Sequence, residues 1–148
     1  MEIDEDTVER LARAIHSNYL AEFAPDGESW EHLDEELKEA NRAQARDIGA
    51  KLDRIGADVS VTTAGNGVTT FTFSDEELET LARAEHERWV AQRTEAGWHT
   101  GDRNDTAKLH PSLVPWEQLS DSEQDKDRDA VRHIPDVLAE VGLRVVRP

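Results

Sequence analysis

Residues 11–16 have the sequence LARAIH, and residues 81–86 have the nearly identical sequence LARAEH. The offset between these segments is 70 residues, and at the same offset Tyr19 corresponds to Trp89. Self-similarity of this kind is typical of a structural unit that occurs more than once in a chain. We therefore predict a fold built from two copies of one unit.

The second half of each copy repeats at a larger offset. Residues 30–59 match residues 116–145 without a gap at an offset of 86, and each segment begins with a tryptophan. The change of offset from 70 to 86 places 16 additional residues in copy two, between Gly97 and Pro115. Because an insertion in one copy of a repeat commonly carries function, this loop is the first candidate for a site.

Both copies have the pattern helix, loop, helix and strand. In copy one, apolar residues recur at helical spacing from Val8 to Phe23, which predicts one buried face that includes Tyr19. A second helix is expected from Trp30 to Ile55, again with its apolar residues on one side.

Three residues are expected to interrupt or end these helices. Gly56 should end the second helix of copy one in the left-handed conformation, and Gly142 should do the same in copy two. Pro135 should break or kink the last helix, since proline lacks the backbone N–H group that the helix needs.

Alternating apolar and polar residues predict short strands. Residues 58–63 and 68–73 flank the sequence AGNG at residues 64–67, a pattern typical of a β-hairpin. Residues 143–146 form the predicted closing strand. The predicted fold class is therefore mostly α with short antiparallel β-strands (α+β).

The repeat also predicts how the chain is divided. A degenerate first copy covers residues 1–63, a hairpin linker covers residues 64–75, and a complete second copy covers residues 76–148. We expect the two copies to share one core and to be related by a pseudo-two-fold rotation.

The composition excludes several classes of partner. The chain has 33 Asp and Glu residues against 17 Lys and Arg residues, which gives a net charge of −16. This field repels nucleic-acid phosphates and anionic lipids, so DNA, RNA and membrane partners are not expected. The acidic N-terminus is unlike a signal peptide, and no apolar run approaches the ~18 residues of a spanning helix, which predicts a cytoplasmic protein.

The available residue types favour a protein without catalysis. The absence of cysteine removes disulfides, thiolate nucleophiles and cysteine-bound zinc. The histidines lack the spacing of zinc ligands, and no nucleophile elbow surrounds a serine, so we expect no catalytic residue, metal or cofactor. His16 and His86 occupy matching positions, which favours a shared structural hydrogen bond over catalysis.

Among the differences between the first helices of the two copies, three lie on the apolar face of copy one. Glu85, Trp89 and Arg93 replace an isoleucine, a tyrosine and a phenylalanine on one helix face. Charges on an inward face cost free energy unless they are paired or serve a ligand. Two alternatives stay open: an ion pair between Glu85 and Arg93 that brackets Trp89, or a stripe that faces a ligand.

The inserted loop at residues 97–111 has the sequence GWHTGDRNDTAKLHP. Trp98 offers an aromatic face, and Arg103, Lys108 and His110 offer hydrogen-bond donors to an anion. This combination suits an aromatic ring that carries phosphate. The alternative is a structural loop anchored by its tryptophan and its final proline.

Copy two contains several motifs at characteristic spacings. They are Leu81-Ala82 with His86 and Trp89, Gly97-Trp98 with Gly101, Lys108-x-His110-Pro111, Trp116-x-x-Leu119, Asp127-Arg128 and Gly142. Over about residues 76–146, this set resembles the RyR domain, a repeat of ryanodine receptor channels that also occurs in many bacterial and phage proteins. Residues 7–60 look like a shortened partner repeat without the loop.

The resemblance implies a pair of helical repeats without known catalytic activity. Because bacterial RyR domains are suspected of sensing nucleotide-derived molecules, we expect a non-enzymatic ligand-sensing protein. Its ligand would be a small nucleotide-derived signal, of the cyclic nucleotide or ADP-ribose type, in bacterial signalling or anti-phage defence. The alternative is an interaction or assembly module that binds a protein partner or a second copy of itself, and a third hypothesis is a hydrolase of a nucleotide signal.

The candidate ligand-binding residues are drawn from both copies. The tryptophans are assigned to stacking, the cations of copy two to phosphate or ribose, and the acidic and histidine side chains to orientation of the ligand. Copy one contributes if the two-fold rotation brings the matching faces together. The full set is Tyr19, Arg42, Glu85, His86, Trp89, Arg93, Trp98, Arg103, Lys108, His110 and Arg128.

Overall fold

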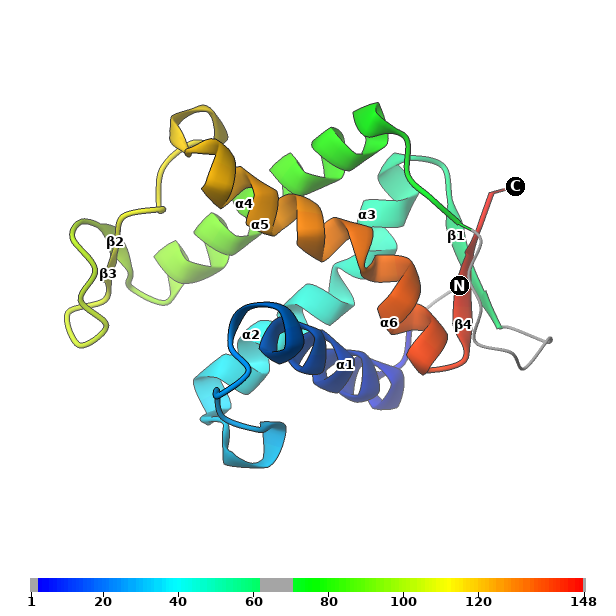
Figure 1. Cartoon of the computed structure of the whole chain (residues 1–148), viewed down its shortest axis with the longest axis horizontal. Helices are drawn as coiled ribbons and strands as arrows, with labels where there is room; N and C mark the ends of the chain where they lie inside the picture. The colour runs from blue at the N-terminus through cyan, green and yellow to red at the C-terminus, as the bar shows by residue number, and fades with distance from the viewer. Residues whose placement is uncertain (1–2, 62–70, 148) are drawn as a thin grey trace. The chain divides into compact units, whose positions relative to one another are not determined.

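The computed structural model describes residues 3–61 and 71–147, and these residues are mostly helical with short strands, as predicted (Figure 1). The elements in chain order are α1 (Glu5–Phe23), η1 (Trp30–His32), α2 (Glu35–Arg46), α3 (Ile48–Arg54), β1 (Asp58–Val61), α4 (Asp75–Glu95), β2 (His99–Thr100), β3 (Leu109–His110), η2 (Trp116–Gln118), α5 (Asp121–Arg132), α6 (Ile134–Glu140) and β4 (Leu143–Val146). The order of elements repeats, since α4, η2, α5, α6 and β4 follow the order of α1, η1, α2, α3 and β1. The strands β2 and β3 lie between α4 and η2, and in the described residues copy one has no strands between α1 and η1. The inserted loop is therefore the difference between the copies in the order of elements.

The elements form two compact units whose boundaries differ from those of the repeats. Unit 1 comprises Met1–Thr72 and His133–Pro148, and unit 2 comprises Phe73–Arg132. The physical reason is that the last helix and strand of copy two pack with copy one: α6 contacts α1, and β4 pairs with β1. The predicted rotation between the copies stays a prediction.

The antiparallel sheet joins segments from opposite ends of the chain. β1 and β4 lie side by side, with Val59 opposite Val145 (Figure 1). Both valines are buried, which anchors the sheet to the core of unit 1. The turn of the predicted hairpin lies outside the described residues, and residues 71–73 of its second strand belong to no strand.

The helix α1 begins and packs largely as its sequence predicts. The side chain of Asp4 accepts a hydrogen bond from the N–H group of Thr7, and Val8 and Leu11 are buried. The prediction is wrong for the last turns, because Tyr19 and Phe23 are 53% and 47% exposed. Copy one lacks the inserted loop, which in copy two packs against the corresponding end of α4.

The second helix of each copy is broken rather than continuous. In copy one the break lies at Asp47, between α2 and α3, and in copy two it lies at His133, between α5 and α6. Pro135 stands in the first turn of α6, as predicted, and the corresponding residue Gly49 is a poor helix former. The predicted single helix from 30 to 55 is therefore wrong.

The expected terminating glycines are confirmed by their backbone angles. Gly56 has a φ of +72° and Gly142 has a φ of +78°, each after the last helix of its copy. These values lie in the left-handed region, where a side chain would be strained. The corresponding glycines therefore redirect the chain into β1 and β4.

The two copies also repeat a histidine hydrogen bond. The Nε2 atom of His16 lies 2.7 Å from the carbonyl oxygen of Glu28, and that of His86 lies 2.6 Å from the carbonyl oxygen of Val114. Since a carbonyl can only accept, each Nε2 atom donates a proton to a bond that holds the loop before the 3-10 helix. The predicted structural role of both histidines is confirmed.

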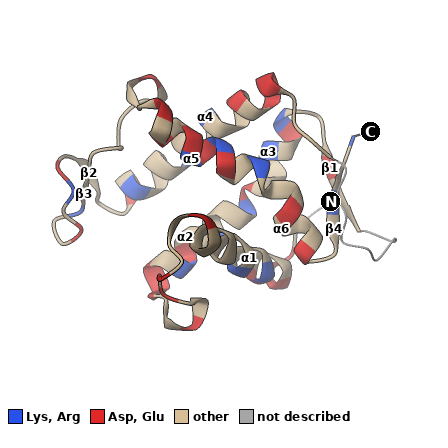
Figure 2. Cartoon of the chain, in the orientation of Figure 1, with Lys and Arg blue, Asp and Glu red and all other residues tan. Residues whose placement is uncertain are grey.

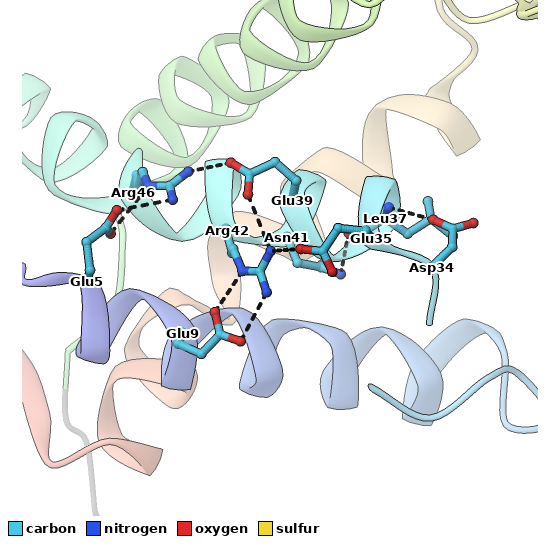
Figure 3. A network of polar contacts seen from close by, with 9 residues as sticks. All are labelled: Glu5, Glu9, Asp34, Glu35, Leu37, Glu39, Asn41, Arg42 and Arg46. Atoms are coloured by element: carbon cyan, nitrogen blue, oxygen red, sulfur yellow. Dashed lines mark hydrogen bonds and ion pairs between the residues drawn. The ribbon is translucent and has the colours of Figure 1, made fainter. Parts of the chain in front are cut away.

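The second repeated contact is an ion pair between an arginine and a glutamate on neighbouring helices, and we call the two pairs the arginine ladder. Arg42 on α2 binds Glu9 on α1 through two hydrogen bonds of 2.7 and 3.2 Å, as Figure 3 shows. Arg128 on α5 binds Glu79 on α4 at 2.9 and 3.0 Å in the same way. These bonds lower the pKa of both carboxyls and raise the pKa of both arginines, so each pair stays charged.

His133 connects α1 with α6 within unit 1. Its Nε2 atom lies 2.7 Å from the Glu22 carboxylate, and its Nδ1 atom lies 3.2 Å from that of Asp136. Partial burial lowers the pKa of His133, but the bonds with Asp136 and Glu22 outweigh this effect and raise the pKa above its ordinary value of 6.5. The protonated imidazole therefore binds both carboxylates in the folded protein.

The contact between His133 and its two carboxylates predicts a pH-dependent contribution to the free energy of unfolding. Because the folded pKa is raised, the contribution of His133 should be fully present below the unfolded value of about 6.5 and be lost as the pH rises through the folded pKa. We expect His133→Gln to lower the free energy of unfolding by about 0.2–1 kcal/mol at pH 5.5 and by less at pH 8.5. Urea unfolding at both pH values tests this, and an equal loss at both would contradict it.

Candidate functional site

The inserted loop starts at the C-terminal end of α4, where a lysine of the loop binds a backbone carbonyl group. After α4, Gly97 has a φ of +94° and the N–H group of Trp98 donates to the carbonyl of Arg93 at 2.9 Å. The Nζ atom of Lys108 donates to the carbonyl of Ala96, also at 2.9 Å. A cation at a helix C-terminus is favoured by the helix dipole. Lys108, predicted to contact phosphate, thus contributes to closing α4.

The rest of the loop is held by backbone hydrogen bonds. His99 donates to Lys108, while Asn104 and Leu109 exchange two bonds. The strands β2 and β3 pair in parallel, and the sequence predicts no strand in this loop. Leu109 also forms an antiparallel bridge with Asn104, so its segment is paired on both sides.

Four side chains of unit 2 gather where this loop meets α4, and we call them the tryptophan cluster: Trp89, Arg93, Trp98 and His110. The guanidinium carbon of Arg93 lies 5.1 Å from the ring centroid of Trp98 and 5.9 Å from that of Trp89. His110 meets the Trp89 ring edge to face, with 5.0 Å between centroids. Both tryptophan contacts of Arg93 lie within cation–π distance.

Arg93 differs from the arginines of the ladder in its charge environment. Arg42 and Arg128 each bind two or more carboxylates. Within residues 3–61 and 71–147, no carboxylate forms an ion pair with Arg93, and the side chain is half-buried. The indole rings carry no negative charge that would neutralise the guanidinium, so its N–H groups can bind an anion.

Trp98 holds a polar atom without a partner. The residue is 8% exposed, and among the described residues its Nε1 atom is buried without a hydrogen bond. A buried donor without an acceptor costs about 1–3 kcal/mol. A rearrangement that gives this N–H group an acceptor would therefore be favoured.

His110 is present mainly in its neutral form at neutral pH. Burial lowers its pKa, and the nearby charges of Arg103 and Arg93 lower it further. Its Nδ1 atom accepts a 3.0 Å hydrogen bond from the N–H group of Ser112, so the proton of the neutral ring is on Nε2. His110 therefore offers an uncharged N–H donor beside the guanidinium.

The acidic member of the predicted stripe has a structural partner. Glu85 is 5% exposed and binds Arg88 through two bonds of 3.0 and 2.8 Å. In the predicted alternatives Glu85 either paired with Arg93 or faced a ligand. Sequence reasoning missed Arg88, although its position three residues after Glu85 on one helix could have revealed it.

The other predicted residues lie outside the tryptophan cluster. His86 borders the cluster, with its ring 5.9 Å from that of Trp89, but it is buried and bound to the carbonyl of Val114. Arg103 forms an exposed ion pair with Asp105 at 3.4 Å. Tyr19 and Arg42 belong to unit 1. Of the eleven candidates, the structure therefore brings together the four of the cluster, with Lys108 at the helix end beside them.

The described residues contain neither a metal-binding cluster nor a membrane-spanning helix. Among the described residues, no group of three or more histidine and acidic side chains could hold a metal ion. Within the same residues, none of the helices combines the length and the apolar character needed to cross a bilayer.

Comparisons with known proteins show the family. No curated protein matches the chain in such a comparison. The family model of the RyR domain matches residues 71–147, which is more than half of the 148 residues. This segment includes the whole inserted loop, the tryptophan cluster and the β4 strand that pairs with β1. The chain belongs to the RyR domain family.

Proposed function

We propose that this RyR domain protein is a non-enzymatic sensor that binds a small nucleotide-derived signal at the tryptophan cluster. The ligand class is a cyclic nucleotide or an ADP-ribose derivative, and the context is bacterial signalling or anti-phage defence in the cytoplasm.

The observation that carries this proposal is the environment of Arg93. In a chain with a net charge of −16, a half-buried guanidinium that forms no ion pair with any carboxylate of the described residues is unusual, and the ladder arginines show how the same fold pairs its cations. The guanidinium lies over the rings of Trp89 and Trp98, which do not neutralise its charge. Phosphate suits this group because guanidinium and phosphate form bidentate, charge-assisted bonds.

The neighbouring donors favour a ligand with further oxygen atoms. Neutral His110 offers an Nε2–H group, which suits a ribose hydroxyl or a phosphate oxygen. The buried Trp98 N–H group finds no acceptor in the described part of the chain, and a rearranged loop with a ligand oxygen would supply one. A phosphorylated sugar beside two indole rings combines these requirements, as nucleotide derivatives do.

The proposal predicts a measurable loss of affinity in cluster variants. Arg93→Gln should weaken binding of the ligand by ~1.5–3 kcal/mol, because it removes charge-assisted bonds. Trp98→Phe should weaken binding less, since it removes the N–H group but keeps an aromatic ring. Isothermal titration calorimetry with ADP-ribose and cyclic AMP measures both effects, after a thermal-shift screen in which ligand at 100 times Kd stabilises by ~2.7 kcal/mol.

Matched controls separate a ligand contact from a structural role. Arg83→Gln changes an arginine on the same helix whose partner is Glu117, so it should leave affinity unchanged. If Arg93→Gln lowers the thermal stability of the ligand-free protein as much as it weakens binding, Arg93 is a structural residue. If no nucleotide derivative binds at millimolar concentration, the sensor proposal is wrong, and if the nucleotide is recovered cleaved, the protein is a hydrolase.

A further inference from the structure

The end of α1 presents an aromatic pair that the fold leaves uncovered. Tyr19 and Phe23 stand one helical turn apart with 5.7 Å between their ring centroids, and both are about half exposed. Exposed rings at adjacent positions form an apolar patch rather than isolated surface residues, and such patches mark interaction sites. We call these two side chains the aromatic pair.

Copy two shows which contacts are made at the positions that correspond to Tyr19 and Phe23. There the ring of Trp89, which corresponds to Tyr19, carries the guanidinium of Arg93 on it and the imidazole of His110 against it. In copy one Phe23 replaces that arginine and the loop is missing. Among the described residues, no lysine or arginine lies over the ring of Tyr19 or Phe23.

The charge around the aromatic pair indicates the sign of a partner. Residues 21–36 contain seven carboxylates and no lysine or arginine. Figure 2 shows this acidic segment in red between α1 and α2. Three of these carboxylates are paired, Glu22 with His133, Glu31 with Arg13 and Glu35 with Arg42. Asp26 and Glu28 are exposed and form no ion pair among the described residues. The patch therefore combines two aromatic rings with the negative charge of these two carboxylates, which attracts cations and repels anions.

We propose that the aromatic pair and the carboxylates beside it bind an arginine-containing peptide segment of another protein. Guanidinium groups of that segment would stack on Tyr19 and Phe23, as Arg93 does on the indole rings of copy two, while further cations face Asp26 and Glu28. Arginine fits better than lysine because its planar guanidinium stacks on aromatic faces and its hydration is weaker. This interaction uses unit 1 and is independent of the tryptophan cluster in unit 2.

A single residue makes the contact directly observable. Tyr19 is the only tyrosine of the chain, so protein labelled with 13C-tyrosine gives one set of ring signals in a heteronuclear NMR spectrum. The probe is an eight-residue peptide of alternating arginine and glycine. We expect it to shift the Tyr19 ring signals in a saturable way, with weaker binding of the lysine analogue and none of the glutamate analogue.

Variants then test whether the rings themselves contribute. Tyr19→Leu combined with Phe23→Leu should weaken binding of a fluorescein-labelled arginine peptide roughly five- to thirty-fold in fluorescence anisotropy, since two cation–π contacts are lost. Both side chains are exposed, so the circular dichroism spectrum should stay unchanged. Val61→Thr alters another exposed apolar residue, on β1, and should leave the affinity unchanged. Arg93→Gln should also have no effect.

Three results would overturn the proposal. The first is equal affinity of the double variant and the wild type, which would mean binding by charge alone. The second is the absence of any shift of the Tyr19 signals at millimolar peptide. The third is self-association of the free protein in sedimentation that the double variant abolishes, which would identify the aromatic pair as an interface between copies of this chain.

Discussion

Replacement of Arg88 by methionine is expected to lower the free energy of unfolding by about 3–5 kcal/mol. The carboxylate of Glu85 is almost completely buried, and Arg88 holds it through two hydrogen bonds. Removal of Arg88 takes two charge-assisted hydrogen bonds from a carboxylate in a poorly solvated site, which is far more costly than the net contribution of the intact pair. Urea unfolding followed by far-UV circular dichroism measures this loss.

The repeat supplies the matched control for this prediction. At the corresponding positions copy one has Ile15 and Asn18, so the same helix is built there without the charged pair. Glu85→Ile combined with Arg88→Asn should therefore regain most of the stability that Arg88→Met loses, since no buried charge remains unpaired. A double variant as unstable as the single variant would show that the loss comes from the packing of the Arg88 side chain and not from the buried charge of Glu85.

Truncation of the tryptophan at the start of η2 should have a comparable effect. Trp116 is 5% exposed, its ring lies 6.1 Å from that of His86, and the guanidinium of Arg128 lies over it at 5.6 Å. Trp116→Ala removes a large ring from a packed site and leaves a cavity, which should cost about 3–5 kcal/mol. The cation–π contact with Arg128 is lost as well.

Copy one again provides the comparison. Trp30 is buried in the same surroundings, next to His16 and under Arg42, so Trp30→Ala should cost a similar amount. Phe23→Ala truncates an exposed aromatic residue and should change stability by about 0.5 kcal/mol or less. Circular dichroism suits these variants because the tryptophan fluorescence signal itself is altered. A small loss in Trp116→Ala would mean that unit 2 collapses around the site or does not depend on this ring.

The duplicated contacts explain why so much of the sequence repeats. The histidine bond, the arginine ladder and the tryptophan under each ladder arginine recur in both copies at the offsets of 70 and 86 residues. The histidine bond and the arginine ladder each join the first helix of a copy to the segment after it, so both offsets are needed to bring their two partners together. The tryptophan and the arginine above it both follow the first helix and repeat at the offset of 86 alone.

The differences between the copies then concentrate at the ends of α1 and α4. One end carries Arg93 and the loop, and the other carries Phe23 and no loop. In our proposals these become two separate sites, one for an anionic small molecule and one for a cationic peptide. The repeat thus offers an internal reference for each site, since Trp89 and Arg93 correspond to Tyr19 and Phe23, which have different chemistry.

Local features of the fold could be predicted from the sequence. Left-handed glycines, the proline in the first turn of α6 and the cap at Asp4 depend on the backbone of a few neighbouring residues. The helical spacing of apolar residues likewise indicates which side of a helix is buried. The exception was the end of α1, where the apolar pattern continues through Tyr19 and Phe23 although both side chains are about half exposed.

The candidate site was predicted less well, because charge pairing depends on residues that are distant in sequence. Arg42, Arg93 and Arg128 look equally suited to bind phosphate in the sequence. Glu9 lies 33 residues from Arg42 and Glu79 lies 49 residues from Arg128, and only the packing of helix on helix brings these carboxylates within 3 Å. Among residues 3–61 and 71–147, Arg93 contacts two indole rings and forms no ion pair with a carboxylate, so of these three arginines it is the one whose charge is not neutralised there.

By itself, the sequence determined the internal repeat of its residues, the glycines after which the chain turns into β1 and β4, and the family that it resembles. These properties follow from local backbone preferences and from periodic spacing, which are encoded within a few residues. The tertiary structure decided that β4 pairs with β1, which cations are neutralised and which aromatic residues stay exposed. Such outcomes depend on which faces of distant segments meet, since burial and charge pairing are properties of the packed chain and not of any one segment.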